Sequence, residues 1–468
     1  MESKRNNLLN SVVIGLFIKG ISAIIEIAIQ MLITNSIGIS EYGNYTFYVS
    51  LIEGTYYILF SGSIKINTFY LSTPTYSLNS FKKKYVTRYV TPIILTIIGV
   101  SYFFRNPYGI ISGIILFIYY VAIDYCSVFY SKGLYIIALL GEYLIGRIFL
   151  LIGIYSVLKI DKGNVRSLLI LYGLQFIIIV LWFILHKNNI ITETNEIKVS
   201  IKKLFEYQIS DIANSFVSYS PTILQFILGD AFTTGFTGII NIITKFINFI
   251  SGPTAKVFLP EFSRLYKNGE KEKLEQSYRM IVRIQMIFIS TIGVVLIGFP
   301  KLFLKMFNPE LEGLSNIFVF TSICLLLIAG IGPVTGLLQM TDNERICNRN
   351  QWISIIVMII VWILCRKNPL FSLYGLAVRA IVEGLLKYLS ICQWFGKSII
   401  SLRNYILLWF PVGIVRFAVF KINCHYSFIA LVISVIFVFL WNTGFALRDP
   451  LIKSTILNKL PNKKFCKK

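Results

Sequence analysis

Charged and amide side chains lie within long apolar stretches of this chain, where the cost of removing them from water must be compensated. Lys19 and Glu26 are seven residues apart and Gln30 follows four later, so all three fall on one face of a helix. Cations of this kind attract an anionic ligand strongly in a low-dielectric setting, and the neighbouring acid can bind and release a proton or a sodium ion. This chemistry suits binding and coupled movement of an anion.

The same pattern recurs further along the chain. One stretch carries Asp211, Ser215, Ser218, Thr222 and Gln225, and the next carries Asn241, Lys245, Asn248 and Gly252 on one face. We interpret seven residues as candidates for a central binding cavity: Lys19, Arg147, Asp211, Asn241, Lys245, Asn248 and Arg379. The candidates for ion coupling are Glu26, Glu53 and Asp124.

A structural role competes with the binding role at some of these positions. Arg379, Glu383 and Lys387 are spaced i, i+4, i+8, so they are able to neutralise one another along one helix. A charge in mid-bilayer costs about 2.5–3.5 kcal/mol, and roughly a dozen facing lipid would cost on the order of 30 kcal/mol. Most of the intramembrane charges must therefore pair, snorkel or line a hydrated cavity.

The composition identifies the elements that hold these residues. Of 468 residues 56% are hydrophobic and only 14% are charged, and apolar runs of roughly 20 residues recur, the length of a helix that crosses a bilayer. We predict an all-α integral membrane protein with about 14 transmembrane helices. The expected spans are 11–33, 44–64, 86–104, 109–130, 134–158, 167–185, 208–228, 235–258, 280–303, 314–338, 351–365, 371–395, 404–421 and 427–447.

The cations between the spans predict the orientation. About 30 lysines and arginines fall on one side and about nine on the other, which places both termini in the cytoplasm. The largest basic cluster, 256–283, is expected to form a cytoplasmic elbow. In it Pro260 ends one helix, the side chains of Phe262, Leu265 and Tyr266 form an interfacial face, and Gly269 interrupts the chain before the next span. The net charge of +23 is explained by loops and anionic headgroups, so we expect no nucleic-acid partner.

The sequence offers few residues for metal binding or catalysis. The seven cysteines are scattered without a CxxC pair and only two histidines occur, so we expect no metal, no cofactor and no catalytic centre. The apolar N-terminal run has no small-residue cleavage site and is expected to stay as the first span. A shift of 191 residues places Lys65 on Lys256 and Gly38 on Gly229, which favours two six-helix lobes related by an axis along the membrane normal. The expected divisions are 1–190, 191–400 and a final helix pair with a basic tail, 401–468.

Four segments carry a resemblance to a known family. The run 37–45, IGISEYGNY, resembles the LG-x-x-x-Y-G-x-Y turn of polysaccharide flippases, and 259–274 is similar to their P-x-x-S-R-L-Y…G…K-L segment. Stretches 332–340 and 374–377 look like their tenth- and twelfth-span motifs. The turn departs from the pattern only at Ile37.

On these motifs the chain resembles the O-antigen (Wzx-type) flippases of the multidrug/oligosaccharidyl-lipid/polysaccharide exporter superfamily. The resemblance implies two lobes around a central cavity, alternating access, and an undecaprenyl-diphosphate-linked oligosaccharide as cargo. It also implies the bacterial inner membrane, and membrane lipids and other polysaccharide-assembly proteins as partners. The alternatives are a lipid II-type flippase, a drug exporter of the same superfamily, and a membrane polysaccharide polymerase or ligase. The last would need a large outer loop, which this sequence lacks.

Overall fold

The computed structural model describes residues 2–71, 107–132, 134–161, 163–186, 201–341, 343–398 and 402–447. Within these ranges the regular elements are helices and none is a strand, which confirms the all-α prediction. The α-helices are α1 (Glu2–Leu71), α3 (Pro107–Ser131), α4 (Tyr135–Leu139), α5 (Gly146–Asp161), α6 (Val165–Leu185), α7 (Ile201–Leu228), α8 (Ala231–Lys267), α9 (Lys271–Gly293), α10 (Pro300–Phe307), α11 (Ser315–Ala329), α12 (Val334–Met340), α13 (Glu344–Cys365), α14 (Pro369–Ser372), α15 (Tyr374–Phe395), α16 (Leu402–Ile422) and α17 (Phe428–Leu447). Short π and 3-10 turns separate some of them: η1 (Leu140–Ile145), η3 (Val294–Gly298) and η4 (Pro309–Leu314).

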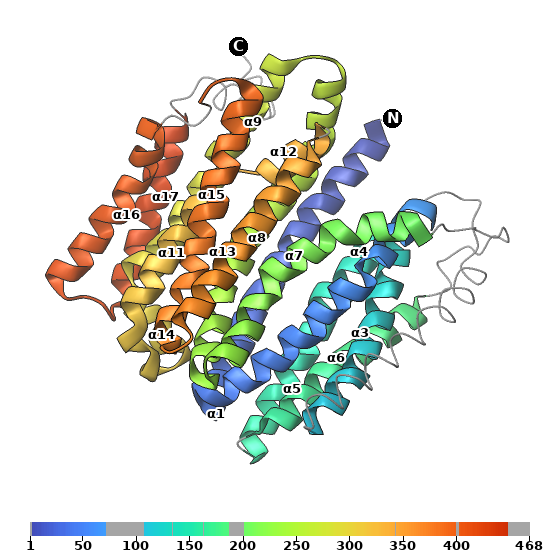
Figure 1. The fold of residues 1–468 in the computed structure, drawn as a ribbon, viewed down its shortest axis with the longest axis vertical. Coiled ribbons are helices and arrows are strands. Elements are labelled where there is room, and N and C mark those ends of the chain that lie inside the picture. The colour runs from blue at the N-terminus through green and yellow to red at the C-terminus, as the bar shows by residue number, and fades with distance from the viewer. Residues whose placement is uncertain are drawn as a thin grey trace, which may run out of the picture. The chain divides into compact units, whose positions relative to one another are not determined.

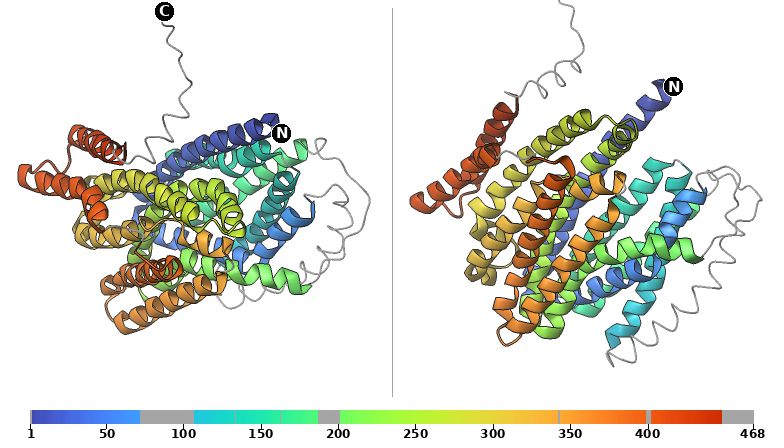
Figure 2. Two further views of the ribbon diagram at one scale, coloured as in Figure 1. Left: turned by 90° about the horizontal axis from the view of Figure 1, so that it is seen from above. Right: turned by 45° about the horizontal axis from the view of Figure 1, so that its top comes forward.

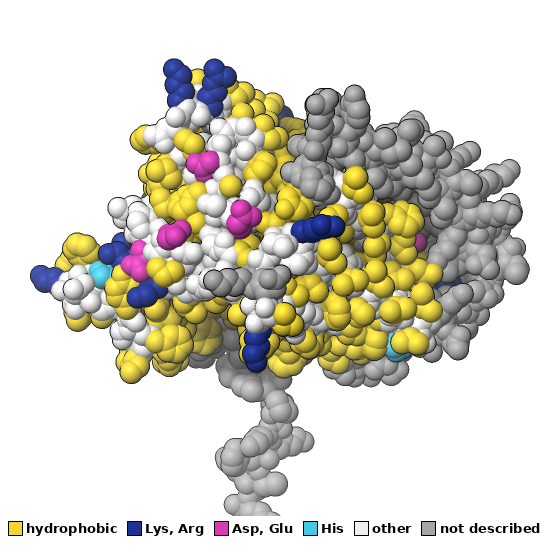
Figure 3. Space-filling view, turned by 90° about the horizontal axis from the view of Figure 1, so that it is seen from below, with side chains coloured by type: hydrophobic (Ala, Val, Ile, Leu, Met, Phe, Trp, Pro, Cys, Tyr) yellow, Lys and Arg dark blue, Asp and Glu magenta, His cyan; other side chains and the backbone are white. Residues whose placement is uncertain are grey.

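These helices carry the apolar lengths that a membrane requires. Ten helical stretches of the described residues are long and apolar enough to cross a bilayer, which makes this a multi-pass membrane protein. Hydrophobic and uncharged side chains dominate the face drawn in Figure 3. Helices occupy the predicted spans, with a non-helical break at 330–333 inside 314–338. The span 86–104 lies outside the described residues, so the count of 14 remains a prediction.

The first two predicted spans form one element with a sharp bend. Gly38 interrupts α1 with φ 79° and ψ 167°, and Figure 1 shows the chain reversing its course there. That backbone conformation is almost restricted to glycine, because a Cβ clashes with the neighbouring peptide. The turn between spans that the sequence predicted is confirmed at this residue.

Chain packing divides the protein into two compact units, each described here by itself. Unit 1 comprises Met1–Ile242 and Ile359–Leu373, and unit 2 comprises Ile243–Met358 and Tyr374–Lys468. In unit 1, α1 packs against α3, α5 and α7. Small residues bring α1 close to the start of α8: a Cβ on Gly43 would lie 1.8 Å from the Ala231 carbonyl oxygen. The lobes expected at 1–190 and 191–400 rest on the weak repeat and remain a prediction.

Unit 2 is built around a core at the turn between α8 and α9. Phe262, Leu265, Leu274 and Tyr278 are buried there. The helix pair α16 and α17, seen side by side in Figure 2, packs against α9. The Asn442 amide donates to the Ser290 hydroxyl at 2.6 Å and ties α17 to α9.

Two details of the elbow correct the sequence reading. Pro260 does not end a helix, because α8 continues through it to Lys267; a helix loses only one hydrogen bond and part of its regularity at a proline, and membrane helices tolerate this. Phe262 and Leu265 are core residues and not an interfacial face, because α9 folds back over them. Gly269, with φ 73°, is confirmed as the break.

The bend at Gly38 predicts a specific loss of stability. Replacing Gly38 with Ala should cost on the order of 1–3 kcal/mol and lower the thermal unfolding midpoint of the purified protein, since the φ of 79° is strained for any residue with a Cβ. Gly413→Ala on α16 is the matched control, because it also has open space around the Cβ position but no positive φ. A Gly38 variant as stable as the control would contradict the strained turn.

Candidate functional site

A charged pair joins two helices inside unit 1. The Arg147 guanidinium of α5 lies 3.6 Å from the Glu26 carboxylate of α1, and both side chains are mostly buried. The Gln30 amide donates to the same carboxylate at 3.4 Å, and the Tyr42 hydroxyl donates to Gln30 at 2.6 Å. The predicted face of span one therefore points into the protein, and it brings one binding candidate and one coupling candidate together.

A second acid on α1 is held by a tyrosine. The Tyr172 hydroxyl of α6 donates to the Glu53 carboxylate at 2.7 Å. At the next residue of α1, the Gly54 carbonyl accepts a hydrogen bond from the Ser215 hydroxyl of α7 at 3.2 Å. Glu53 thus lies where three helices of unit 1 meet, with a hydroxyl as its hydrogen-bond donor.

Lys19 lies near a π-helical turn. Its ammonium is 4.7 Å from the centre of the Tyr143 ring, on η1. The next residue back, Glu142, accepts hydrogen bonds from the Tyr130 hydroxyl at 2.7 Å and the Cys126 thiol at 3.4 Å. π turns are frequent at functional sites, because the extra residue redirects side chains. Glu142 falls within the expected span 134–158, but nothing in its spacing predicted the turn or these donors.

Other candidates on α3, α7 and α8 are more dispersed. Asp124 is partly buried on α3, and the Asn241 amide of α8 donates to the Thr222 hydroxyl of α7 at 2.9 Å. Lys245 is exposed on α8. Asp211 and Asn248 lie on α7 and α8, and their side chains are outside those described.

The polar stripe on α7 is partly used for packing within unit 1. Thr222 and Gln225 are each 1% exposed. The Gln225 amide donates to the Thr233 hydroxyl at 2.8 Å and accepts from the Ser372 hydroxyl at 2.9 Å. A buried amide with its donors and acceptors engaged fixes helix positions. These two side chains are closed to a ligand in this conformation.

In unit 2 three charges of α15 form one ion network. Glu383 accepts from Arg379 at 3.0 Å and from Lys387 at 2.6 Å. The Arg379 and Glu383 side chains are only 5% and 9% exposed. The predicted mutual neutralisation is therefore confirmed, and two cations sharing one carboxylate leave the network with one net positive charge.

The described residues hold no group of three His, Cys, Asp or Glu side chains placed to bind a metal ion. The polar groups described above are cations, carboxylates, amides and hydroxyls. This arrangement can attract an anion and exchange protons. The binding and coupling roles of the individual residues remain predictions.

Comparison with known proteins gives a fold and no family. No protein-family profile matches the chain, and no curated protein matches it. Among solved structures, a lipid II flippase, MurJ, in an inward closed conformation matches with a TM-score of 0.68 and 15% identity over 93% of this chain and 99% of that one.

Multidrug transporters, one of them of the MOP superfamily, are also similar. An inward-facing MATE family transporter matches with a TM-score of 0.60 and 11% identity over 82% of this chain and 98% of that one. The MATE multidrug transporter DinF-BH matches with a TM-score of 0.57 and 13% identity, over 84% and 95%. The chain therefore has the fold of MOP-superfamily transporters, as its motifs predicted; identities this low show the fold alone.

The ion pair of Glu26 and Arg147 predicts that substitutions at these two residues have non-additive effects on stability. Glu26→Gln and Arg147→Met should each lower the thermal unfolding midpoint, because each removes one charge of a mostly buried ion pair. The double variant should lose about 1–3 kcal/mol less stability than the sum of the losses in the two single variants. The same cycle on Glu270 and Lys273, an exposed pair at 2.5 Å, should show a smaller coupling because water screens it. Strict additivity at Glu26 and Arg147 would contradict the interaction.

Proposed function

We propose that this protein is a flippase that moves an undecaprenyl-diphosphate-linked oligosaccharide, an O-antigen or similar surface polysaccharide unit, from the cytoplasmic to the outer leaflet of the bacterial inner membrane. The observation that carries the proposal is the match to a lipid II flippase along nearly the whole length of both chains. The multidrug exporters match a smaller share of this chain. The helix pair α16–α17 and the basic cavity candidates further favour a lipid-linked, anionic cargo.

The candidates for binding the diphosphate are the cations Lys19 and Arg147 in unit 1 and Lys245 and Arg379 in unit 2, because attraction to an anion grows as water is excluded. Amide and carboxylate groups at Asp211, Asn241 and Asn248 would bind the sugars. Partner proteins of polysaccharide assembly would supply the cargo and receive it.

The pair formed by Arg147 and Glu26 suggests how binding couples to ions. When an anion binds the Arg147 guanidinium, the attraction between Arg147 and Glu26 weakens, and Glu26 gains affinity for a proton or a sodium ion. Glu53 and Asp124 would serve the same purpose at their own helices. One charge that crosses 100 mV supplies about 2.3 kcal/mol, which is enough to bias alternating access.

A lipid II-type flippase is the second candidate, favoured by the same structural match. The two cargoes share a polyprenyl diphosphate and differ in the sugar. Parallel flipping assays in proteoliposomes, one with lipid II and one with a lipid-linked O-antigen unit, separate them. Faster movement of lipid II would replace the first proposal with the second, and movement of cationic drugs alone would reject both.

The binding assignment predicts a loss of transport. Lys19→Ala and Lys245→Ala should each reduce export of surface polysaccharide about tenfold, which corresponds to about 1.4 kcal/mol of lost attraction, with protein level unchanged. Lys19→Arg should retain activity because it keeps the charge. Lys273→Ala, at an exposed residue of the elbow, is the control expected to have no effect. Full activity in both alanine variants would exclude a cavity role for these lysines.

The orientation predicts reporter activity. Alkaline phosphatase inserted within 159–165 or 301–313 should be active, because both segments are expected on the outer side. A fluorescent protein inserted at 268–270 should fluoresce in the cytoplasm. Cytoplasmic placement of both outer segments would overturn the proposed topology and the cytoplasmic termini with it.

A further inference from the structure

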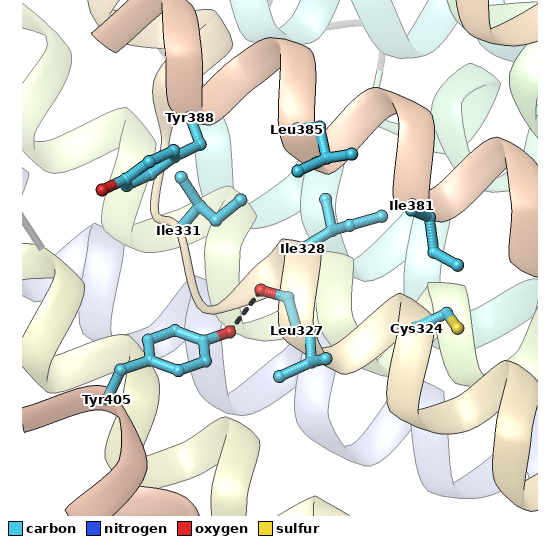
Figure 4. A pocket seen from close by; sticks show the side chains of 9 residues that line it. Cys324, Leu327, Ile328, Ile331, Ile381, Leu385, Tyr388 and Tyr405 are labelled. Atoms are coloured by element: carbon cyan, nitrogen blue, oxygen red, sulfur yellow. Dashed lines mark hydrogen bonds between the residues drawn. The ribbon is translucent and has the colours of Figure 1, made fainter. Parts of the chain in front are cut away.

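Unit 2 contains an apolar pocket of about 280 Å³ between α11, α15 and α16. Figure 4 shows Tyr388, Ile331 and Tyr405 toward one end and Ile381 and Cys324 toward the other. Its lining is almost wholly hydrocarbon. Several of these side chains are open to the outside; Leu385 is 57% exposed and Ile381 42%. The pocket therefore opens on a surface that a bilayer would cover.

One glycine and two hydrogen-bonded tyrosine hydroxyls determine the shape and the polarity of the pocket. A Cβ on Gly384 would lie 2.8 Å from Ile328, so glycine lets α15 approach α11 closely at the pocket floor. The Tyr405 hydroxyl donates to the Leu327 carbonyl at 2.6 Å. The Tyr388 hydroxyl lies 3.0 Å from the Ser398 hydroxyl. Since both tyrosine hydroxyls already have partners, the pocket offers a ligand apolar surface only.

The lining residues lie at successive depths along the helices. Seven residues separate Ile381 from Tyr388 on α15, so the lining covers about 10 Å of that helix; Cys324 lies on α11 and Ile331 in the turn that follows it. In the proposed orientation, Tyr388 and Tyr405 lie near the cytoplasmic ends of their spans, where tyrosines prefer to sit. The pocket thus runs from the inner interface into the hydrocarbon core, the course of a lipid chain in the inner leaflet.

The cytoplasmic end of α15 carries excess positive charge. Ser398, which contacts Tyr388, follows Lys397, whose ammonium lies 2.9 Å from Glu275 and whose side chain is 60% exposed. Arg279 binds the same carboxylate at 2.9 Å. Two cations on one acid leave one net positive charge beside the cytoplasmic end of the pocket, which complements an anionic headgroup.

We propose that an anionic phospholipid of the inner leaflet places one acyl chain in this pocket, with its headgroup near Lys397, and that it fills the space between α16 and the helices α11 and α15. The proposal rests on the proposed membrane orientation. It concerns a resident lipid and not the transported cargo. The volume of about 280 Å³ lies just below the usual range for ligand pockets, roughly 300–1,000 Å³, and suits a segment of one unbranched chain better than a bulky methyl-branched polyprenyl tail.

Photo-crosslinking tests the site directly. The full-length protein, reconstituted in phosphatidylcholine vesicles that contain phosphatidylglycerol with a diazirine on one acyl chain, should crosslink at peptides of α11, α15 and α16. Leu385→Trp fills the pocket and should reduce this crosslinking at least fivefold. Leu389→Trp is the matched control, because Leu389 lies one turn further on the same helix and is 53% exposed but does not line the pocket. Equal crosslinking in both variants indicates surface lipid only and overturns the site.

Competition identifies the lipid. Unlabelled phosphatidylglycerol should displace the probe better than phosphatidylcholine with the same chains, and Lys397→Gln should reduce that preference about fivefold, the effect of about 1 kcal/mol per cation near a lipid surface. Equal displacement by both lipids overturns the headgroup contact. Stronger displacement by a polyprenyl phosphate makes the pocket a cargo-tail site and overturns the resident lipid. Crosslinking needs no transport, so its failure is distinct from failure of the flipping assays.

Discussion

The cost of an unpaired charge in a hydrocarbon environment governs this structure. An ionised side chain near the middle of a bilayer costs several kcal/mol, which is comparable to much of the stability of a folded domain. The chain meets this cost in three ways. Arg379 and Lys387 share Glu383 along one helix, Arg147 meets Glu26 across two helices, and Glu142 is held by a hydroxyl and a thiol. Each solution fixes the rotation of the helices that carry it.

The sequence was most informative where the relevant contacts are local. The spans follow from apolar length, the ion network of α15 follows from i, i+4 spacing, and the bends at Gly38 and Gly269 follow from the conformational freedom of glycine. The Pro260 prediction was wrong for the converse reason. A local helix-breaking tendency was outweighed by the packing of Phe262 and Leu265 under α9, which keeps α8 helical to Lys267.

Contacts between distant residues were beyond the sequence reading. Glu53 and Tyr172 are 119 positions apart, and only the packing of α1 against α6 brings them together. The π turn at Leu140–Ile145 interrupts a span that hydropathy shows as one uniform run. The polar stripe of α7 also shows that the sequence does not reveal tertiary contacts. Periodicity predicted that Thr222 and Gln225 share a face, but whether that face meets a cavity or another helix depends on tertiary packing.

The difference between the two ion clusters bears on how a coupled transporter would work. Arg379, Glu383 and Lys387 lie on one helix, so any rigid movement of α15 carries all three together and leaves their distances unchanged. Glu26 and Arg147 lie on different helices and are already at 3.6 Å, so a small shift of α1 against α5 weakens their attraction. A site whose charge state must change with conformation needs the second arrangement. Our proposal of ion coupling therefore rests on the pair between helices, and the network on α15 supplies one fixed positive charge to unit 2.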